Sequence, residues 1–177
     1  MNMKKIILLL FVLIISVSWV SIKKVEKKSN RSDVTLKYID RFKRTAMAEH
    51  NQYCIPASII LAQGILESAS GQSKLVNKTN NHFGIKCIGN CNNKNSYMMA
   101  DDDPYDRFIK YKSAWWSYRH HSKFLISNSR YEPCFKCGND YKCWAKQLKK
   151  CGYATSKTYD KKLIKIIETY KLHQYDK

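Results

Sequence analysis

A run of apolar and small residues from 57 to 70 limits how this chain can fold more than any other feature. Its only ionisable residue is Glu67. Pro56 suits the first turn of a helix, and Gly71 is typical of a helix end. Because a helix of this composition has no polar face to present to water, we expect it to lie at the centre of the molecule.

Glu67 is the residue in this helix that most needs an explanation. Helical spacing places it on one face with Gln63 and Gly64. An apolar surround raises the pKa of a carboxyl group, and a carboxyl kept protonated can act as a general acid. Glycine inside a helix costs about 1 kcal/mol relative to alanine and is typical of a close approach by a backbone or ligand. The alternative for Glu67 is an ion pair with a buried Lys or Arg, or an exposed place at the helix end.

The first residues predict export. Residues 1–22 combine a basic start with a long apolar stretch, which is typical of a signal peptide or of a retained N-terminal membrane anchor. Residues 23–32 are charged and polar, which predicts a linker. The remainder, residues 33–177, is long enough for one domain with its own core. Either form of the leader predicts a location in the periplasm or the cell envelope.

The charge balance predicts an anionic partner. The 177 residues include 32 Lys and Arg against 14 Asp and Glu, a formal net charge of +18. Nucleic acid, an anionic wall polymer and an anionic membrane surface all fit this charge. The export signal and the absence of a basic reader motif argue against nucleic acid. We therefore expect a cell-wall or membrane surface as the partner, and a monomeric protein.

Seven cysteines agree with an oxidising compartment. Cys87 and Cys91 are close enough to close a short loop by a disulfide. The last four allow three pairings, or a tetrahedral zinc site, and disulfides are favoured because the chain is predicted to be exported. They are Cys134, Cys137, Cys143 and Cys151. Since the count is odd, one thiol stays free, and we expect it to be Cys54.

The elements predict a mainly α domain with one small β lobe. Helical periodicity indicates helices over about 33–50, 57–70, 113–124, 141–150 and 156–172. Residues 83–87 and 96–100 are strand candidates. Residues 130–139 are expected to form a loop. Trp116, His120 and Phe124 recur at helical spacing, and we expect Trp115, Trp116 and Trp144 to pack in the core.

The ordered motifs resemble a known family. These segments are I-P-A-S-I-I-L-A-Q-G-I-L-E-S-A-S-G, N-N-H-F-G-I-K-C, D-D-D, F-I-K-Y-K-S-A-W-W-S-Y-R-H-H-S-K-F-L and W-A-K-Q-L-K-K-C-G-Y-A-T. Their succession over about 33–172 resembles the glucosaminidase family of peptidoglycan hydrolases, glycoside hydrolase family 73. The resemblance implies a lysozyme-like α+β fold. It also implies an endo-β-N-acetylglucosaminidase that cleaves the β-1,4 bond between N-acetylglucosamine and N-acetylmuramic acid in peptidoglycan, with no metal or cofactor.

The same resemblance implies roles for single residues. Glu67 matches the catalytic acid, and Tyr153 matches a tyrosine that faces the cleft. Asn81 and Phe83 match the segment that lines the sugar groove. Gln63, one turn before Glu67, is expected to hydrogen-bond the carboxyl or the substrate. His82 is expected to be structural or exposed.

The second carboxylate is the uncertain part of the predicted site. Glycosidases that use a water molecule need two carboxylates unless the substrate assists. The predicted β lobe lacks the family's usual acid, so the candidates are Asp101, Asp102 and Asp103, and we favour Asp102. A lytic transglycosylase, which needs one acid, and a non-catalytic wall-binding module are the alternatives.

Overall fold

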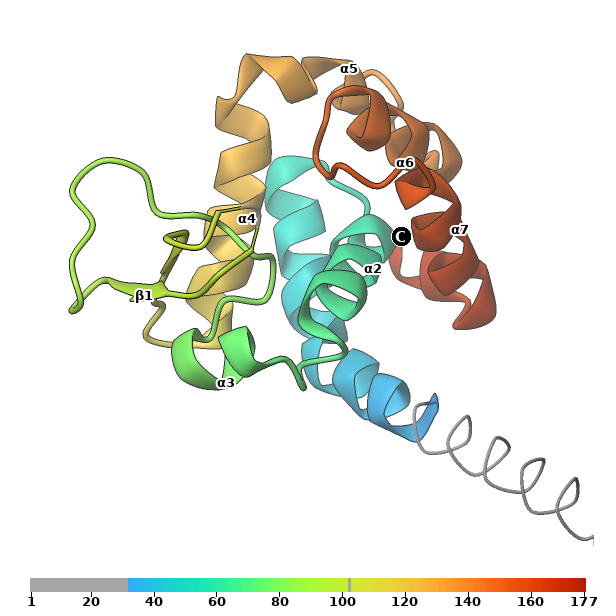
Figure 1. Cartoon of the computed structure of the whole chain (residues 1–177). Helices are drawn as coiled ribbons and strands as arrows, with labels where there is room; N and C mark the ends of the chain where they lie inside the picture. Colours follow the sequence, from blue (N-terminus) through green and yellow to red (C-terminus); the bar gives the residue numbers. More distant parts are fainter. Residues whose placement is uncertain (1–31, 102) are drawn as a thin grey trace, which may run out of the picture. The chain divides into compact units, whose positions relative to one another are not determined.

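The computed structural model describes residues 32–101 and 103–177 (Figure 1). The chain divides into two compact units, Met1–Lys37 and Tyr38–Lys177. Of the first unit, only residues 32–37 are described, and they are helical. The predicted leader and linker therefore lie almost wholly outside the described residues. Within 32–101 and 103–177, no helix combines the length and the apolar character needed to cross a bilayer.

The predicted central helix is α2, Ala57–Ser68. Every residue from Ala57 to Ile65 is buried, which fits its lack of a polar face. Pro56 is its N-cap, and the helix ends two residues earlier than predicted, at Ser68. Two helices, α6 (Tyr141–Lys150) and α7 (Tyr159–Thr169), pack against α2 (Figure 1). The short 3₁₀ helix η2 (Leu172–Tyr175) also packs against α2.

The C-terminal helices cover one side of α2. Helix α6 spans Tyr141–Lys150, as predicted, and α7 spans Tyr159–Thr169, followed by η2 at Leu172–Tyr175. Trp144 of α6 is fully buried and confirms its prediction as a core residue. The predicted loop at 130–139 was wrong in part, because it contains the short helix α5, Glu132–Phe135, after the 3₁₀ turn η1, Ser129–Tyr131.

Helix α4, Ala114–Ser127, turns a different face to the core from the predicted one. Its buried residues are Ser117, Tyr118, His121, Ser122 and Leu125. The prediction that Trp115 and Trp116 are core residues was wrong, since 44% and 50% of their surfaces are exposed. The helical period was right but its phase was off by one residue, because spacing alone does not distinguish aromatic residues on the surface from those in the core.

A small β lobe follows α3, Lys74–Thr79. It consists of strands β1, Ser96–Met98, and β2, Arg107–Ile109, which pair antiparallel with Tyr97 opposite Phe108. The prediction of a strand over 83–87 was wrong apart from one bridge, Lys86 to Phe108. The mainly α fold with a small β lobe confirms the predicted class.

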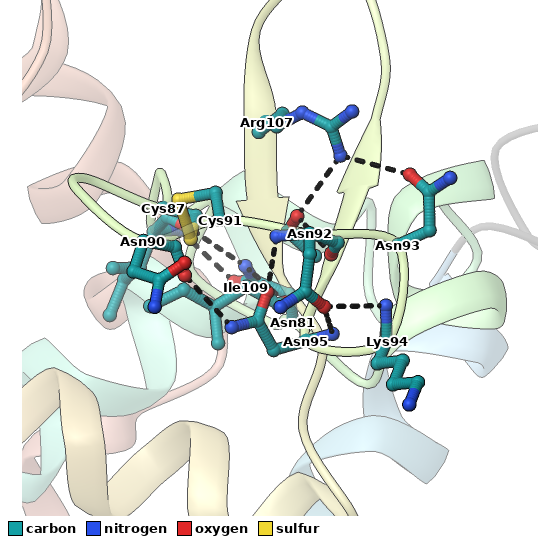
Figure 2. The surroundings of a disulfide bond; sticks show 12 residues. Asn81, Cys87, Asn90, Cys91, Asn92, Asn93, Lys94, Asn95, Arg107 and Ile109 are labelled. Carbon is teal, nitrogen blue, oxygen red and sulfur yellow. Dashed lines mark hydrogen bonds between the residues drawn. A yellow bond between two sulfur atoms is a disulfide. The ribbon is translucent and has the colours of Figure 1, made fainter.

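The Cys87–Cys91 disulfide closes the loop before β1, as predicted (Figure 2). The asparagine-rich turn beside it is held by its own side chains. Asn92 Oδ1 accepts from the backbone amides of Lys94 and Asn95, and Arg107 donates to Asn93 Oδ1 (Figure 2). These bonds brace the turn without an acidic residue.

The remaining cysteines pair less completely than predicted. Cys137 and Cys143 form a disulfide, so these two sulfurs are not available as ligands of the alternative four-cysteine zinc site. Cys54 is free and exposed, in line with the prediction, but Cys134 and Cys151 are also free. Burial, together with the neighbouring Cys151, raises the pKa of the Cys134 thiol to about 12.

Gly64 is the point on α2 where two tyrosine hydroxyls approach the backbone. A Cβ atom at Gly64 would lie 2.6 Å from the Tyr38 hydroxyl and 3.1 Å from that of Tyr118. The Tyr118 hydroxyl donates to that of Tyr38 over 2.9 Å, and Tyr38 is also hydrogen-bonded to His82 Nδ1. The close approach that this glycine suggested is therefore made by side chains of the core.

Gly64→Ala should lower the free energy of unfolding by about 1–3 kcal/mol, because the added methyl group overpacks a closed hydrogen-bonded cluster. Urea unfolding followed by circular dichroism measures this change. In a Tyr38→Phe background the nearest atom is gone, so the same substitution should cost less. An equal cost in both backgrounds would show that contact with Tyr38 is not the cause.

Candidate functional site

Glu67 opens into a cavity of about 510 Å³ between the end of α2 and the β lobe. The lining includes Phe83, Asp101 and Phe108 on the lobe side and residues 152–155 after α6. Glu67 lies in the last turn of α2, just before Ala69 and Ser70, which both adopt left-handed backbone conformations. Non-glycine residues in this conformation are strained, and such strain is frequent at functional sites.

Burial raises the pKa of Glu67 above its ordinary value of 4.5. A hydrogen bond from Tyr159 and the charge of Lys162 oppose this rise, while the charge of Asp101 adds to it. The negative end of the α2 dipole also disfavours a carboxylate at this position. The predicted environment of Glu67 is therefore present, and the side chain can hold a proton at higher pH than an exposed glutamate.

A buried series of hydrogen bonds supports the Glu67 carboxyl. The hydroxyl of Tyr159 on α7 donates a hydrogen bond to Glu67 Oε1 over 2.9 Å. Gln63 Nε2 donates to the Tyr159 oxygen over 3.0 Å, and Gln63 Oε1 lies 3.2 Å from His121 Nε2. In this series of hydrogen bonds each donor and each acceptor is defined. Residues of α2, α4 and α7 therefore together fix the orientation of the Glu67 carboxyl.

His121 ends this series as a neutral donor. Burial lowers the pKa of His121 to about 3, with a smaller contribution from His120. Because an amide oxygen only accepts, Nε2 must carry the ring proton. Its Nδ1 is buried without a partner among the described residues, and its ring stacks on Phe83 at 3.9 Å. Neither Tyr159 nor His121 was predicted as a site residue.

Tyr153 and Phe83 line the cavity, as their predicted roles require. Burial raises the pKa of the Tyr153 hydroxyl well above its ordinary value, with further contributions from Glu67, Tyr131 and Tyr111. The Tyr153 hydroxyl therefore stays protonated and can donate a hydrogen bond. The Tyr153 ring stacks on the ring of Tyr159, the residue whose hydroxyl is hydrogen-bonded to Glu67. Phe83 also belongs to the lining, but its ring is almost fully buried between His121 and Tyr118, so its predicted contact with a sugar stays a prediction.

Gln63 and Asn81 lie behind the cavity lining. The Gln63 amide is used by Tyr159 and His121. Asn81 Nδ2 donates to the carbonyls of Ile85 and Ile109, and its Oδ1 accepts from the Ile85 amide. Both side chains would have to exchange partners to touch a ligand, so their predicted substrate contact stays a prediction. In the structure Asn81 braces the turn that carries Phe83.

The three consecutive aspartates, residues 101–103, do not share one environment. Asp101 lines the same cavity as Glu67, and its Oδ2 lies 3.8 Å from Lys86 Nζ. Asp103 Oδ1 accepts from the Tyr105 amide and so belongs to an exposed turn. Asp102 lies outside the described residues, and its role stays a prediction. Within 32–101 and 103–177 no group of three or more His, Cys, Asp or Glu side chains is arranged to hold a metal ion.

Tyr159→Phe should shift the titration of Glu67 to higher pH, because the lost hydrogen bond holds that pKa down. The basic limb of the pH profile of kcat/KM, where Glu67 loses its proton, should then move upward. We also expect kcat to fall about tenfold, since one hydrogen bond no longer orients the carboxyl. Tyr170→Phe, one residue beyond α7, is the matched control. An unmoved basic limb in Tyr159→Phe would contradict this role.

The sequence matches a family model over residues 43–172, and its description is glucosaminidase, mannosyl-glycoprotein endo-β-N-acetylglucosaminidase. The exo-glucosaminidase LytG of Bacillus subtilis is 32% identical over 164 residues, which cover 86% of this chain and 57% of LytG. The peptidoglycan hydrolase FlgJ of Vibrio parahaemolyticus is 28% identical over 122 residues, covering 63% of this chain and 40% of FlgJ. The chain thus spans about half the length of these two relatives.

Solved structures agree with the sequence match. The catalytic domain of the autolysin Auto from Listeria monocytogenes superposes with a TM-score of 0.68 at 28% identity. The alignment covers 84% of this chain and 97% of that domain. The described fold therefore matches nearly the whole of that catalytic domain.

Proposed function

The chain belongs to the glucosaminidase family, and from this premise we propose that it is a peptidoglycan hydrolase. The bond cleaved is the β-1,4 bond between N-acetylglucosamine and N-acetylmuramic acid, within the glycan strand. Relatives named as a peptidoglycan hydrolase and an autolysin support this substrate.

The observation that carries the proposal is the half-buried Glu67, with its raised pKa, at the wall of a cavity of about 510 Å³. Cleavage of a glycosidic bond requires a proton on the leaving oxygen, and Glu67 supplies it as the general acid. Tyr153 offers its hydroxyl to the substrate, and the Phe83 ring packs against a sugar. Gln63 acts through Tyr159 by fixing the carboxyl.

The second carboxylate is Asp101 in this proposal, with Asp102 as the sequence-based alternative. Asp101 shares the cavity with Glu67, and its charge contributes to the raised pKa of Glu67. A carboxylate there is placed to activate water or to stabilise positive charge on the sugar. Lys86 Nζ lies 3.8 Å from Asp101 Oδ2 and 2.9 Å from Asp106 Oδ2, so its positive charge faces both carboxylates.

Peptidoglycan lies outside the cytoplasm, so the proposed substrate requires export. Residues 1–22 carry the sequence signal for it, either cleaved or retained as an anchor, and they lie outside the described residues. The domain proposed to act on the glycan is residues 33–177, working as a monomer without a cofactor.

Exo action is a second candidate because the relative LytG is named an exo-glucosaminidase. An endo enzyme shortens long strands at once, whereas an exo enzyme releases small products while the strands stay long. The size distribution of the glycan early in a digest separates these two actions.

Release of soluble fragments from purified insoluble peptidoglycan tests the proposed function. We expect the wild-type chain to release reducing sugar ends with time. Binding to the particles without any release would indicate a wall-binding module and would overturn the proposal. Because Glu67 must be protonated, the rate should fall as pH rises through its raised pKa.

A further inference from the structure

A second hollow of about 410 Å³ lies along α4 and shares no lining residue with the Glu67 cavity. Its lining combines basic and aromatic side chains and contains no carboxylate. These residues are Lys110, Tyr111, Lys112, Trp116, Arg119, His120 and Lys123. The hollow is thus a distinct surface feature whose chemistry differs from that of the Glu67 cavity, which is lined by both carboxyl groups and lysines.

Two of its four permanent cations are already engaged. Arg119 donates from Nε to the buried Glu49 over 2.9 Å and from a terminal nitrogen to the Tyr53 hydroxyl. Lys110 Nζ donates to the Asn93 carbonyl over 2.7 Å. In contrast, Lys112 and Lys123 are exposed and form no ion pair within residues 32–101 and 103–177. Three ammonium charges of the hollow, on Lys110, Lys112 and Lys123, therefore have no ion-pair partner among these residues, and Lys110 is the one already bonded to a carbonyl.

The aromatic wall is open to solvent. Half of the Trp116 surface is exposed, and its ring meets that of Trp115 edge-on at 4.8 Å. The guanidinium of Arg119 lies 5.0 Å from the centre of the Trp115 ring, which steadies the pair. Tyr111 and His120, which also line the hollow, share a hydrogen bond of 2.7 Å, and burial lowers the pKa of His120. An exposed indole beside ammonium groups is suited to an anion that also has an apolar face.

We propose that this hollow binds a phosphodiester-linked polymer of sugar or polyol units. Lysine is a common phosphate ligand that acts as a point charge, and the arginine fork, which would suit a carboxylate or a phosphate, is here engaged by Glu49 and Tyr53. The Trp116 face packs against the unit between phosphates. A net charge of +18 favours a polyanion over a single anion. The hollow gives the chain an attachment point separate from its cleavage site, and this inference does not depend on the proposed hydrolysis.

The test compares two variants with the same change of charge. Lys112→Glu/Lys123→Glu reverses two of the four permanent charges of the hollow, and Lys161→Glu/Lys165→Glu makes the same change of charge at exposed positions of α7. Affinity of the full chain for poly(glycerol phosphate) is measured by titration calorimetry at fixed ionic strength. We expect the first variant to bind about tenfold more weakly and the second to stay within about twofold of the wild type. Trp116→Ala should also weaken binding, with the fold checked by circular dichroism.

Several outcomes would overturn the proposal. Equal weakening by both charge variants would mean that only the overall charge attracts the polymer. Equal affinity for hyaluronan, a carboxylate polymer, would remove the preference for phosphate. Tighter binding of a single-stranded oligonucleotide that depends on Lys112 and Lys123 would assign the hollow to nucleic acid. Peptidoglycan hydrolysis by each variant is measured in parallel, so a loss of polymer binding is distinguished from a failure of the proposed enzyme.

Discussion

Glu67→Gln should release soluble fragments from purified peptidoglycan at least about 100-fold more slowly than the wild-type chain. Glutamine keeps the shape of the side chain and can still accept from Tyr159, but it has no proton to give to the leaving oxygen. General acid catalysis contributes about 10²–10⁴ in rate. Initial rates of reducing-end release from the same peptidoglycan preparation measure the loss.

Stability provides the control for this variant. The raised pKa means that the folded chain holds a proton on Glu67 at pH values where the unfolded chain, with an ordinary value of 4.5, has lost it. The stability of the fold therefore decreases as pH rises from 4.5 through the folded pKa. Since glutamine does not ionise, Glu67→Gln should be at least as stable as the wild type at neutral pH. Full activity in a folded Glu67→Gln protein would exclude Glu67 as the acid.

Asp101→Asn should lower kcat about 100-fold if Asp101 is the second carboxylate. The charge of Asp101 also raises the pKa of Glu67, so its removal should move the basic limb of kcat/KM to lower pH. This shift is opposite in sign to the one expected for Tyr159→Phe. A full pH profile of kcat/KM for each variant measures both effects in one experiment.

Asp102→Asn and Asp103→Asn are the comparison variants. Asp103 belongs to an exposed turn, so its substitution should leave the rate within about twofold. A large loss in Asp102→Asn together with an active Asp101→Asn would support the sequence-based assignment and contradict ours. Wild-type rates in all three would indicate a mechanism with one acid.

Most of the fold that could be predicted from the sequence was predicted from the apolar composition of α2. A helix without a polar face has to lie in the interior, as α2 does. Trp144, on the helix over 141–150, was likewise predicted to be buried, and it is. Helix α4 shows the limit of this logic. Trp116 and His121 are both compatible with its periodicity, and the face that packs is decided by partners distant in sequence, such as Phe83 and Gln63.

The same limit explains what was missed in the site. Glu67 was detectable because one charge in an apolar run is a local signal. The Tyr159 hydroxyl reaches Glu67 across 92 residues of sequence, and no local pattern distinguishes it from any other tyrosine at a helix start. Asn81 was assigned to the sugar groove through the resemblance, and its bonds to the backbone of Ile85, which no local pattern indicates, are what the structure adds; its contact with substrate stays a prediction.

Mass analysis of the glycan ends tests the central claim most directly. Purified peptidoglycan is digested with the wild-type chain and, in parallel, with Glu67→Gln. We predict fragments with N-acetylglucosamine at the reducing end in the first digest and none above background in the second. Fragments that end in anhydro-muramic acid, or equal digestion by the variant, would contradict the account of Glu67 as the acid of a water-using glucosaminidase.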